Sequence, residues 1–304
     1  MAIITPALIS ALKTSFQKHF QDALATAPSA YLEVATVIQS TTASNTYGWL
    51  GQFPKLREWI GDRVVKDMAA QGYQITNKLF EGTVGVKRTD IEDDNLGIYT
   101  PLMQEMGRAA GVHPDELVFE LLKLGDSSLC YDGQNFFDTD HPVFPNVDGT
   151  GTAVMVSNLF EPASDPGPAW FLLDTSRSLK PLIYQERVKP DFTAMTKDDD
   201  EQVFMADEYR YGVRARSNVG FGFWQLAAMS TKPLNAANFR EAYNAMRDQK
   251  ADGGRPLGVK PTLLVVPTSL DEAAREVVGV ARLSNGADNP NYNLVKVLDT
   301  AWLN

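Results

Sequence analysis

One short stretch of this chain holds the side chains best suited to chemistry. Cys130, Asp140 and His141 lie close together in the sequence. A thiol, an imidazole base and an orienting carboxylate are the groups that a cysteine hydrolase brings together. The text around the cysteine, SSLCYDG, carries no hydrolase signature and is typical of a strand that ends before a turn. Because a lone cysteine usually packs as a small apolar residue, we expect no catalytic role for Cys130, with a cysteine hydrolase as the alternative.

Metal binding finds little support in the spacing of the possible ligands. His19, His113 and His141 stand far apart, without the HExxH or CxxC spacing of zinc sites. Asp138 and Asp140 could hold a hard cation together with a carbonyl oxygen. The loop nevertheless lacks the further spaced carboxylates of a calcium loop. We therefore expect no bound metal.

Glycine-rich and acidic stretches also fail to match known sites. DGTGT at 148–152 has no following Lys-Ser/Thr pair, so it does not match a phosphate loop, and GFGF at 220–223 lacks the dinucleotide spacing. The acidic runs at 92–94 and 198–201 stand beside Gly and Lys, a context typical of solvated turns. The sequence thus predicts a protein that is not an enzyme and has no catalytic residues and no cofactor.

Charge and composition narrow the function further. The chain has 304 residues, of which 44% are hydrophobic, enough for one large domain or two small ones. Its formal net charge is -10, from 38 acidic and 28 basic residues, so it does not resemble a protein that grips nucleic acid. A single cysteine excludes an internal disulfide, and we expect folding in a cytosol. No apolar run is long enough to span a membrane, and the first residues do not resemble a signal peptide.

Arg210, Arg214 and Arg216 form the one dense basic cluster of the sequence. They alternate with apolar residues in the stretch 209–228, YRYGVRARSNVGFGFWQLAA, which predicts a strand with the arginines on one face. They could pair with acidic groups across a subunit contact or face nucleic acid. The negative net charge of the chain favours pairing across a subunit contact over binding of nucleic acid.

A long polar excursion runs from Trp49 to Thr100. Large apolar residues stand among Gly, Pro and charges at 47–63, and strand-like alternation follows at 73–86. Few of these positions could fill a core by themselves. The stretch is either an exposed hairpin on an ordinary domain or an arm whose apolar residues become buried only against neighbouring copies. The second interpretation gives these candidates for inter-subunit contacts: Trp49, Phe53, Trp59, Ile75 and Phe80.

The other elements make a mixed α+β pattern without the regular βαβ rhythm of a doubly wound sheet. Apolar residues at helical spacing predict a helix near the N-terminus, and Thr100-Pro101 predicts the start of a long helix that ends near Gly125. Gly111 to Pro114 should kink or restart that helix. The further expectations are two strands in 169–190, a helix capped by Asn235, a buried strand at 262–266, a helix with a capping box of Ser269 and Glu272, and a last strand at 292–298.

The ordered set of segments resembles the major head subunit (T protein) family of Mu-like phages. The resemblance covers most of the chain, from about residue 35 to the C-terminus. No single segment is a catalytic signature, and it is the combination that is specific. The matching text is YGWLGQFPKLREWIGDR, VGVKRTDIEDDNLGIY, YDGQNFFDTDHP, YGVRARSNVGFGFWQLA, GRPLG and PTLLVVPTSLDEAAR.

This resemblance implies the tailed-phage capsid fold of the Hong Kong 97 type. The expected parts are an N-terminal arm, an extended β loop, a long spine helix, a peripheral domain and an axial domain. Placed on this sequence they are an arm at 1–45, the extended loop at 46–100, the spine helix and peripheral domain at 101–230, the axial domain at 231–290, and a C-terminal strand returning to the core at 291–304.

The resemblance also implies a function. Copies of the chain should assemble as hexamers and pentamers into an icosahedral head shell around double-stranded DNA, in the virion and, during assembly, in the host cytoplasm. The implied partners are the chain itself, a scaffolding protein and a portal during assembly, and packaged DNA through weak non-specific contacts, without a membrane. An encapsulin-like compartment shell is the alternative from a related class.

Overall fold

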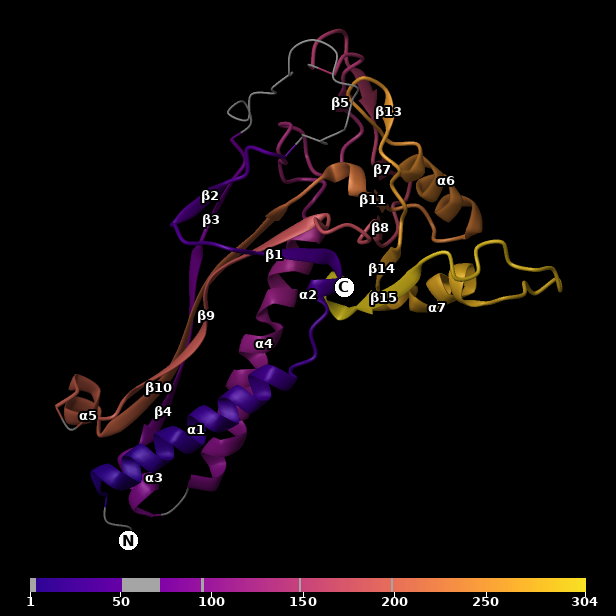
Figure 1. Cartoon of the computed structure of the whole chain (residues 1–304). Helices are drawn as coiled ribbons and strands as arrows, with labels where there is room; N and C mark the ends of the chain where they lie inside the picture. Colours follow the sequence, from indigo (N-terminus) through magenta and orange to yellow (C-terminus); the bar gives the residue numbers. More distant parts are fainter. Residues whose placement is uncertain (1–3, 51–71, 94–95, 148, 198) are drawn as a thin grey trace.

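Two long antiparallel strands set the shape of the chain (Figure 1). β9 (Leu182–Met195) and β10 (Glu208–Phe221) form a hairpin, and β4 (Lys78–Lys87) pairs along the other edge of β10. β1 (Ala35–Gln39) runs parallel to the first half of β9, which gives the sheet order β1-β9-β10-β4. The far end of the hairpin, with α5 (Glu201–Ala206), lies at one end of the elongated molecule, beside α1 (Pro6–Thr26) and β4.

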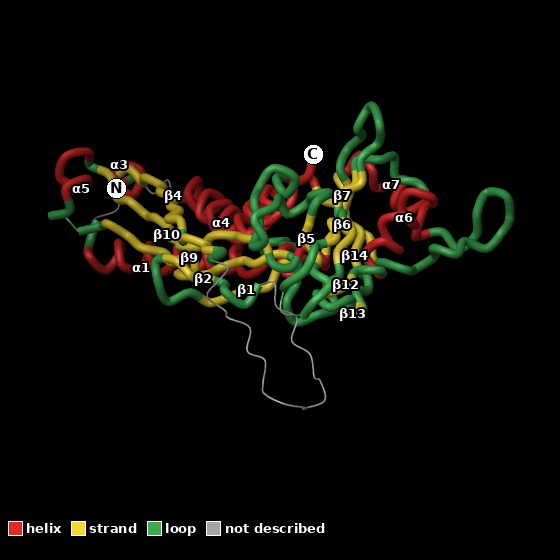
Figure 2. The backbone as a smooth tube through the Cα atoms, turned by 90° about the horizontal axis from the view of Figure 1, so that it is seen from above, coloured by secondary structure: helices red, strands yellow, loops and turns green. Residues whose placement is uncertain are grey.

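A second sheet forms the centre of the opposite end (Figure 2). In this computed structural model, residues 4–50, 72–93, 96–147, 149–197 and 199–304 are described. The second sheet combines antiparallel and parallel pairs, and all residues of β14, β8 and β11 in it are buried, as expected where both faces of a sheet are covered. Its strand order is β15 (Lys296–Thr300), β14 (Leu263–Pro267), β8 (Trp170–Leu173), β11 (Ala227–Ser230) and β7 (Leu159–Phe160).

Helices α1 (Pro6–Thr26) and α4 (Tyr99–Lys123) pack together beside the long sheet (Figure 1). The Thr5 hydroxyl accepts a hydrogen bond from the Leu8 N–H at 3.2 Å and so caps α1. The apolar face predicted for this helix is confirmed, because its members are all buried against aromatic residues of β9 and β10. The members of that face are Ile9, Leu12, Phe16 and Phe20.

The crossing of α1 and α4 is unusually close at two glycines. A Cβ on Gly107 would lie 2.2 Å from the backbone oxygen of Phe20, and one on Gly111 would lie 2.5 Å from the Cβ of Ala27. The two glycines stand four positions apart, so they share one face of α4. This face lets the two helix backbones approach each other without an intervening side chain.

The long helix differs in detail from its sequence prediction. It begins at Tyr99, and Ile98 precedes it without a side-chain cap, so Thr100 is not the N-cap. The helix also continues through Pro114 without restarting, because packing against α1 and the sheet on both sides of this residue outweighs the missing hydrogen bond. Its buried face includes Met103, Val118, Phe119 and Leu122, whereas Leu102 is exposed, as is Leu124 directly after the helix.

Other predicted elements are partly confirmed. Asn235 caps α6 (Ala236–Arg247), and its side chain accepts hydrogen bonds from the N–H groups of the second and third residues that follow. The strand at 262–266 is β14, and the strand predicted over 209–228 ends at Phe221. The chain then turns at Gly222, where a Cβ would meet the carbonyl oxygen of Lys180 at 2.8 Å, and enters the second sheet as β11.

The capping box predicted for Ser269 and Glu272 is wrong. Residues 268–270 form a 3₁₀ turn, and the short helix α7 (Asp271–Ala274) follows without a side-chain cap.

The other elements of the described residues are short. They are α2 (Tyr31–Val34), β2 (Ser44–Thr46), β3 (Gln74–Thr76), α3 (Arg88–Glu92), β5 (His141–Val143), β6 (Val154–Val156), β12 (Lys250–Ala251), β13 (Arg255–Pro256), a π turn at Arg275–Gly279, and 3₁₀ turns at Leu96–Ile98, Trp224–Leu226 and Ala301–Leu303.

The core divides into two parts that follow the two ends of the molecule. The larger part surrounds the second sheet and reaches the C-terminal half of α4, and the smaller part lies between α1, α4 and the long sheet. Among the described residues, no helix is both long and apolar enough to cross a membrane. The division into five parts expected from the sequence stays a prediction.

The close crossing at Gly107 gives a first prediction. Gly107→Ala should lower the free energy of unfolding by about 1–3 kcal/mol, because the new methyl group would press on the backbone of α1 and cost more than the gain in helix propensity. Urea unfolding followed by circular dichroism measures this change. Gly97→Ala is the matched control, since nothing lies within 4 Å of its Cβ position, and an equal loss of stability in both variants would contradict the prediction.

Candidate functional site

The polar excursion leaves and rejoins the fold at one place. β2 and β3 pair antiparallel, with Asn45 opposite Ile75, and the Tyr47 N–H donates to the Tyr73 carbonyl at 2.8 Å just beyond the pair. Residues 47–73 therefore start and end side by side. We call β2, β3 and their flanking residues 40–50 and 72–77 the loop root.

The loop root is fixed to the long sheet by buried polar contacts around Gln185 of β9. The Tyr47 hydroxyl donates to Oε1 of Gln185 at 2.7 Å, and Nε2 of Gln185 donates to the Ile75 carbonyl at 3.1 Å and to Oδ1 of Asn77 at 2.8 Å. Asn77 in turn donates to the Ser40 hydroxyl at 2.9 Å. Every polar atom of the Gln185 side chain thus has a partner, which makes this network favourable although it is buried.

The apolar residues predicted to contact neighbouring subunits have different surroundings. Trp49 is half-buried, with its ring centroid 5.9 Å from that of Tyr47 and 6.1 Å from that of Phe223. Phe80 is half-buried beside His113 of α4, at 4.3 Å between ring centroids. Phe53 and Trp59 lie outside the described residues.

Ile75 does not fit the expectation that only assembly buries these side chains. It is 3% exposed and belongs to the larger core, where its side chain fills the space above Gly220. Tyr47 and Leu50 are buried in the same core. The stretch thus supplies core residues to its own chain, because the loop root folds back onto β9 and β10. Its contacts with other copies stay a prediction.

The arginines of β10 lie on the face opposite the buried tyrosines Tyr209 and Tyr211. Arg210 contacts Glu208 on the same strand, at 3.4 Å from Nε to Oε2. Arg214 is exposed and stands opposite Asp191 of β9 and Glu81 of β4 in the strand register. An irregularity in the pairing with β9 follows it, around Arg216. The cluster is therefore mixed with acidic residues of its own sheet, on the face that α1 and α4 leave uncovered.

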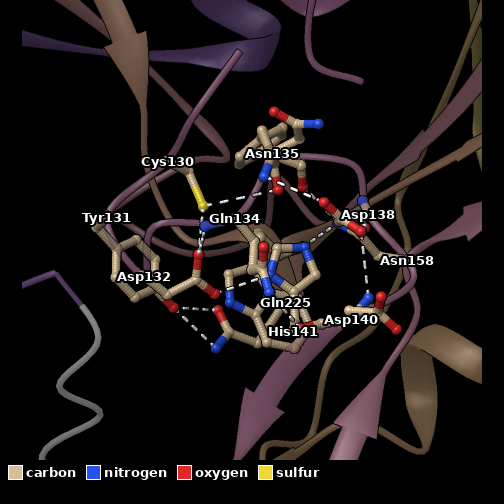
Figure 3. A network of polar contacts seen from close by, with 12 residues as sticks. Cys130, Tyr131, Asp132, Gln134, Asn135, Asp138, Asp140, His141, Asn158 and Gln225 are labelled. Carbon is tan, nitrogen blue, oxygen red and sulfur yellow. Dashed lines mark hydrogen bonds and ion pairs between the residues drawn. The ribbon is translucent and has the colours of Figure 1, made fainter. Parts of the chain in front are cut away.

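Cys130 and His141 belong to one buried polar cluster, in which Asp132 takes the place that the sequence offered to Asp140 (Figure 3). Asp132 lies between Cys130 and His141: its Oδ1 accepts from the Cys130 thiol at 3.0 Å, and its Oδ2 is 2.8 Å from Nδ1 of His141. The Gln134 N–H donates to the same carboxylate at 3.1 Å. The His141 ring stacks on Trp224, with 4.0 Å between centroids and 9° between planes. We call Cys130, Asp132 and His141 the Cys-Asp-His cluster.

Electrostatics in this cluster keep the thiol protonated. Burial, followed by the nearby charge of Asp132 and the hydrogen bond to it, raises the pKa of Cys130 well above its ordinary value. Burial alone would raise the pKa of Asp132 too, but hydrogen bonds from His141 and Cys130 outweigh this and hold its pKa below the ordinary value. A thiol that donates to a carboxylate is the opposite of the activated thiolate of a cysteine hydrolase. The hydrolase alternative has no support in this geometry.

Asp138 and Asp140, considered above as possible cation ligands, make contacts within their own turn. The Asp140 carbonyl oxygen accepts from Nε2 of Gln134 at 3.0 Å. Asp138 accepts from the backbone N–H groups of Asn135, Thr139 and Asp140, at 3.2, 2.7 and 3.3 Å, and so closes its own turn. Asp132 was missed in the sequence, where only its place two residues after Cys130 could have drawn attention.

Comparison with known proteins adds evidence on the whole chain. The family model described as "Mu-like prophage major head subunit gpT" matches residues 9–303. The chain is 53% identical over 284 residues to the major capsid protein of Escherichia phage Mu, which covers 93% of both chains. It is also 53% identical over 280 residues to the Mu-like prophage FluMu major head subunit of Haemophilus influenzae, which covers 91% of both.

Solved structures show the same likeness. The chain in the procapsid of bacteriophage JBD30 is 83% identical and superimposes with a TM-score of 0.88, over 98% of this chain and 100% of that one. The chain in the JBD30 capsid matches with a TM-score of 0.75 and 64% identity over 100% of both chains.

The Gln185 network gives a second prediction. Gln185→Ala should lower the free energy of unfolding by about 1–3 kcal/mol, because Tyr47 and Asn77 would keep buried polar groups without partners. Gln39→Ala is the matched control, an exposed glutamine on the neighbouring strand β1 whose loss should cost at most about 0.5 kcal/mol. Thermal and urea unfolding of both variants measure the difference, and equal effects would contradict a special role for Gln185.

The state of Cys130 gives a third prediction. Iodoacetamide at neutral pH should alkylate Cys130 at least about tenfold more slowly in the folded protein than in urea, because the thiol is buried and its pKa is raised. Mass spectrometry after timed quenching measures the labelled fraction. Labelling of the folded protein as fast as in urea would show an accessible, reactive thiol and contradict the prediction.

Proposed function

Because this chain belongs to the Mu-like prophage major head subunit gpT family, it is a phage major capsid protein, and we propose that its copies form the hexamers and pentamers of an icosahedral shell around double-stranded DNA. The single observation that carries this conclusion is the match to the JBD30 procapsid chain, at 83% identity over nearly the whole length. The fold is that of tailed-phage capsid proteins, and the chain is a structural protein rather than an enzyme.

The shape of the chain supports assembly through many contacts. The hairpin of β9 and β10 runs away from the second sheet to one end of the molecule, where α5 leaves Phe204 81% exposed and Met205 74% exposed. Large apolar side chains exposed side by side at such a tip are typical of a surface that a partner covers. We propose that this tip and residues 47–73 reach neighbouring copies. Each contact can be modest, because the summed contacts of a closed shell hold each subunit.

Charge supports weak contact with the packaged DNA. With a net charge of -10, the chain repels phosphates overall, so DNA could pack and leave without being held. The arginines of β10 stand among acidic residues of the same sheet, which favours charge pairing across subunit contacts rather than phosphate binding. Arg210, Arg214 and Arg216 would then set the register between copies.

The partners during assembly follow from the same proposal. We propose that a scaffolding protein and a portal direct shell closure in the host cytoplasm. Chains similar to this one are found in the JBD30 procapsid, the JBD30 capsid and the JBD30 capsid decorated with minor capsid protein trimers. These states support an assembly that proceeds through a precursor shell. An encapsulin-like compartment is not favoured, because the relatives are phage head subunits.

Removal of part of the excursion tests this proposal and is the fourth prediction. A deletion of residues 65–90 would also remove β3 and β4, which pair with β2 and β10, so it would damage the fold itself. Replacement of 52–70 by a short Gly-Ser linker spares both ends of the loop root. The variant should unfold like the wild type but form no closed particles with co-expressed scaffolding protein in negative-stain electron microscopy.

A scrambled 52–70 segment of the same length and composition is the matched control. It moves Phe53 and Trp59, so failure of both variants would indicate specific side-chain contacts, and failure of the linker variant alone would indicate a need for length. Closed particles from the linker variant would contradict a role of this segment in assembly.

A further inference from the structure

The Cys-Asp-His cluster carries chemistry that the capsid function does not use. Its three donor atoms, a sulfur, a carboxylate oxygen and an imidazole nitrogen, all lie within 4.8 Å of one another. All three residues lie in the segment 130–141. This segment folds back on itself, so that His141, the first residue of β5, lies close to Cys130 (Figure 3). Cys130 is 5% exposed, His141 is fully buried, and the Asp132 side chain is 8% exposed.

One polar atom of the cluster lacks a hydrogen-bond partner within the described residues. Asp132 is a carboxylate, and its hydrogen-bond donors are a thiol, a backbone N–H and the imidazole of His141. Nε2 of His141 is buried and has no hydrogen-bond partner among the described residues. A buried carboxylate beside an imidazole with an unpartnered ring nitrogen is a place where a cation gains.

From this geometry we propose that Cys130, Asp132 and His141 form a binding site for a thiophilic divalent cation of the zinc type. Thiolate, imidazole and carboxylate together are zinc ligands, whereas calcium and magnesium take oxygen ligands alone. Zinc bond lengths of about 2.0–2.3 Å in a tetrahedral site place neighbouring donors roughly 3.4–3.6 Å apart. The hydrogen-bonded pairs are now at 3.0 and 2.8 Å, so they would need to open by roughly 0.4–0.8 Å, and the sulfur and the imidazole nitrogen already lie within 4.8 Å of each other.

The proton balance of binding is simple. The cation replaces the thiol proton, which leaves to solvent, and Cys130 binds as a thiolate. The proton that Nδ1 of His141 donates to Asp132 is transferred to Nε2 through solvent, so that His141 binds through the Nδ1 lone pair and Asp132 binds through a carboxylate oxygen. Three protein ligands leave a fourth position for water. A cation would enter the site past Asp132, because this residue is the most solvent-exposed of the three.

The surroundings would hold such a site rigidly. His141 is fixed by its stack on Trp224, and the Tyr131 hydroxyl contacts Gln225 at 3.1 Å. Between the ligands, Phe136 and Phe137 are fully buried in the larger core. A cation would therefore close a short loop around two core side chains and stabilise this turn-rich part of the subunit.

Metal loading of the purified full chain tests the proposal. After treatment with EDTA, the protein is incubated with Zn²⁺, passed over a desalting column and analysed for metal by mass spectrometry. The wild type should retain about one Zn²⁺ per chain, and Cys130→Ser and Asp132→Asn should each retain about tenfold less or lower. Asp140→Asn and His19→Gln are the matched controls outside the cluster and should bind as the wild type does.

Cobalt gives a readout that does not depend on any variant. Co²⁺ bound by the wild type should show sulfur-to-cobalt charge-transfer absorption in the near ultraviolet, which Zn²⁺ abolishes by displacement. Retention of Zn²⁺ by Cys130→Ser at the wild-type level, absence of Zn²⁺ from the wild type, or a Co²⁺ spectrum without that absorption would each overturn the proposal. If Cys130→Ser fails to fold, the wild-type Co²⁺ spectrum alone decides. None of these outcomes bears on shell formation, so the capsid function is tested separately.

Discussion

The packing of α1 and α4 on one face of the long sheet holds the extended half of this subunit together. A narrow sheet of long strands has little interior of its own, so a helical layer must cover its aromatic face. Phe16 meets Tyr211 edge to face at 5.1 Å, and Phe20 meets Phe192 at 5.4 Å, so the small core is built of interlocking rings. Gly107 and Gly111 let the two helices come close enough for both to reach the sheet.

A second set of contacts fixes the segment that follows α1 to helix α4. The Asp115 carboxylate, on α4, accepts hydrogen bonds from the Ala30 and Tyr31 N–H groups, at 2.7 to 3.0 Å, and from the Ser29 hydroxyl at 2.8 Å. It therefore satisfies free N–H groups at the start of α2. The Gln185 network does the same for the loop root. In both places, a segment that joins the fold from outside its sheets is anchored by a buried polar side chain whose hydrogen-bonding atoms have partners. Apolar contacts alone would fix position less specifically than these directional bonds.

The Cys-Asp-His cluster shows how position decides chemistry. The same inventory of thiol, imidazole and carboxylate suits a hydrolase when the base faces the thiol. Here Asp132 stands between them, so the thiol donates a hydrogen bond and stays protonated. Such an arrangement favours a structural role, which a bound cation would strengthen.

Elements whose signals are local could be predicted from the residues alone. The face of α1, the Asn235 cap and the alternation of arginines with tyrosines in β10 could all be predicted, because spacing and capping depend on near neighbours in the chain. The family resemblance determined the function in the same way, through ordered segments. Three features follow from the three-dimensional packing instead: Ile75 is buried in its own chain, α4 continues through Pro114, and Asp132 rather than Asp140 joins Cys130 to His141. Each of these depends on contacts between segments distant in the sequence or on the path of a turn, which residue types and spacing alone do not fix.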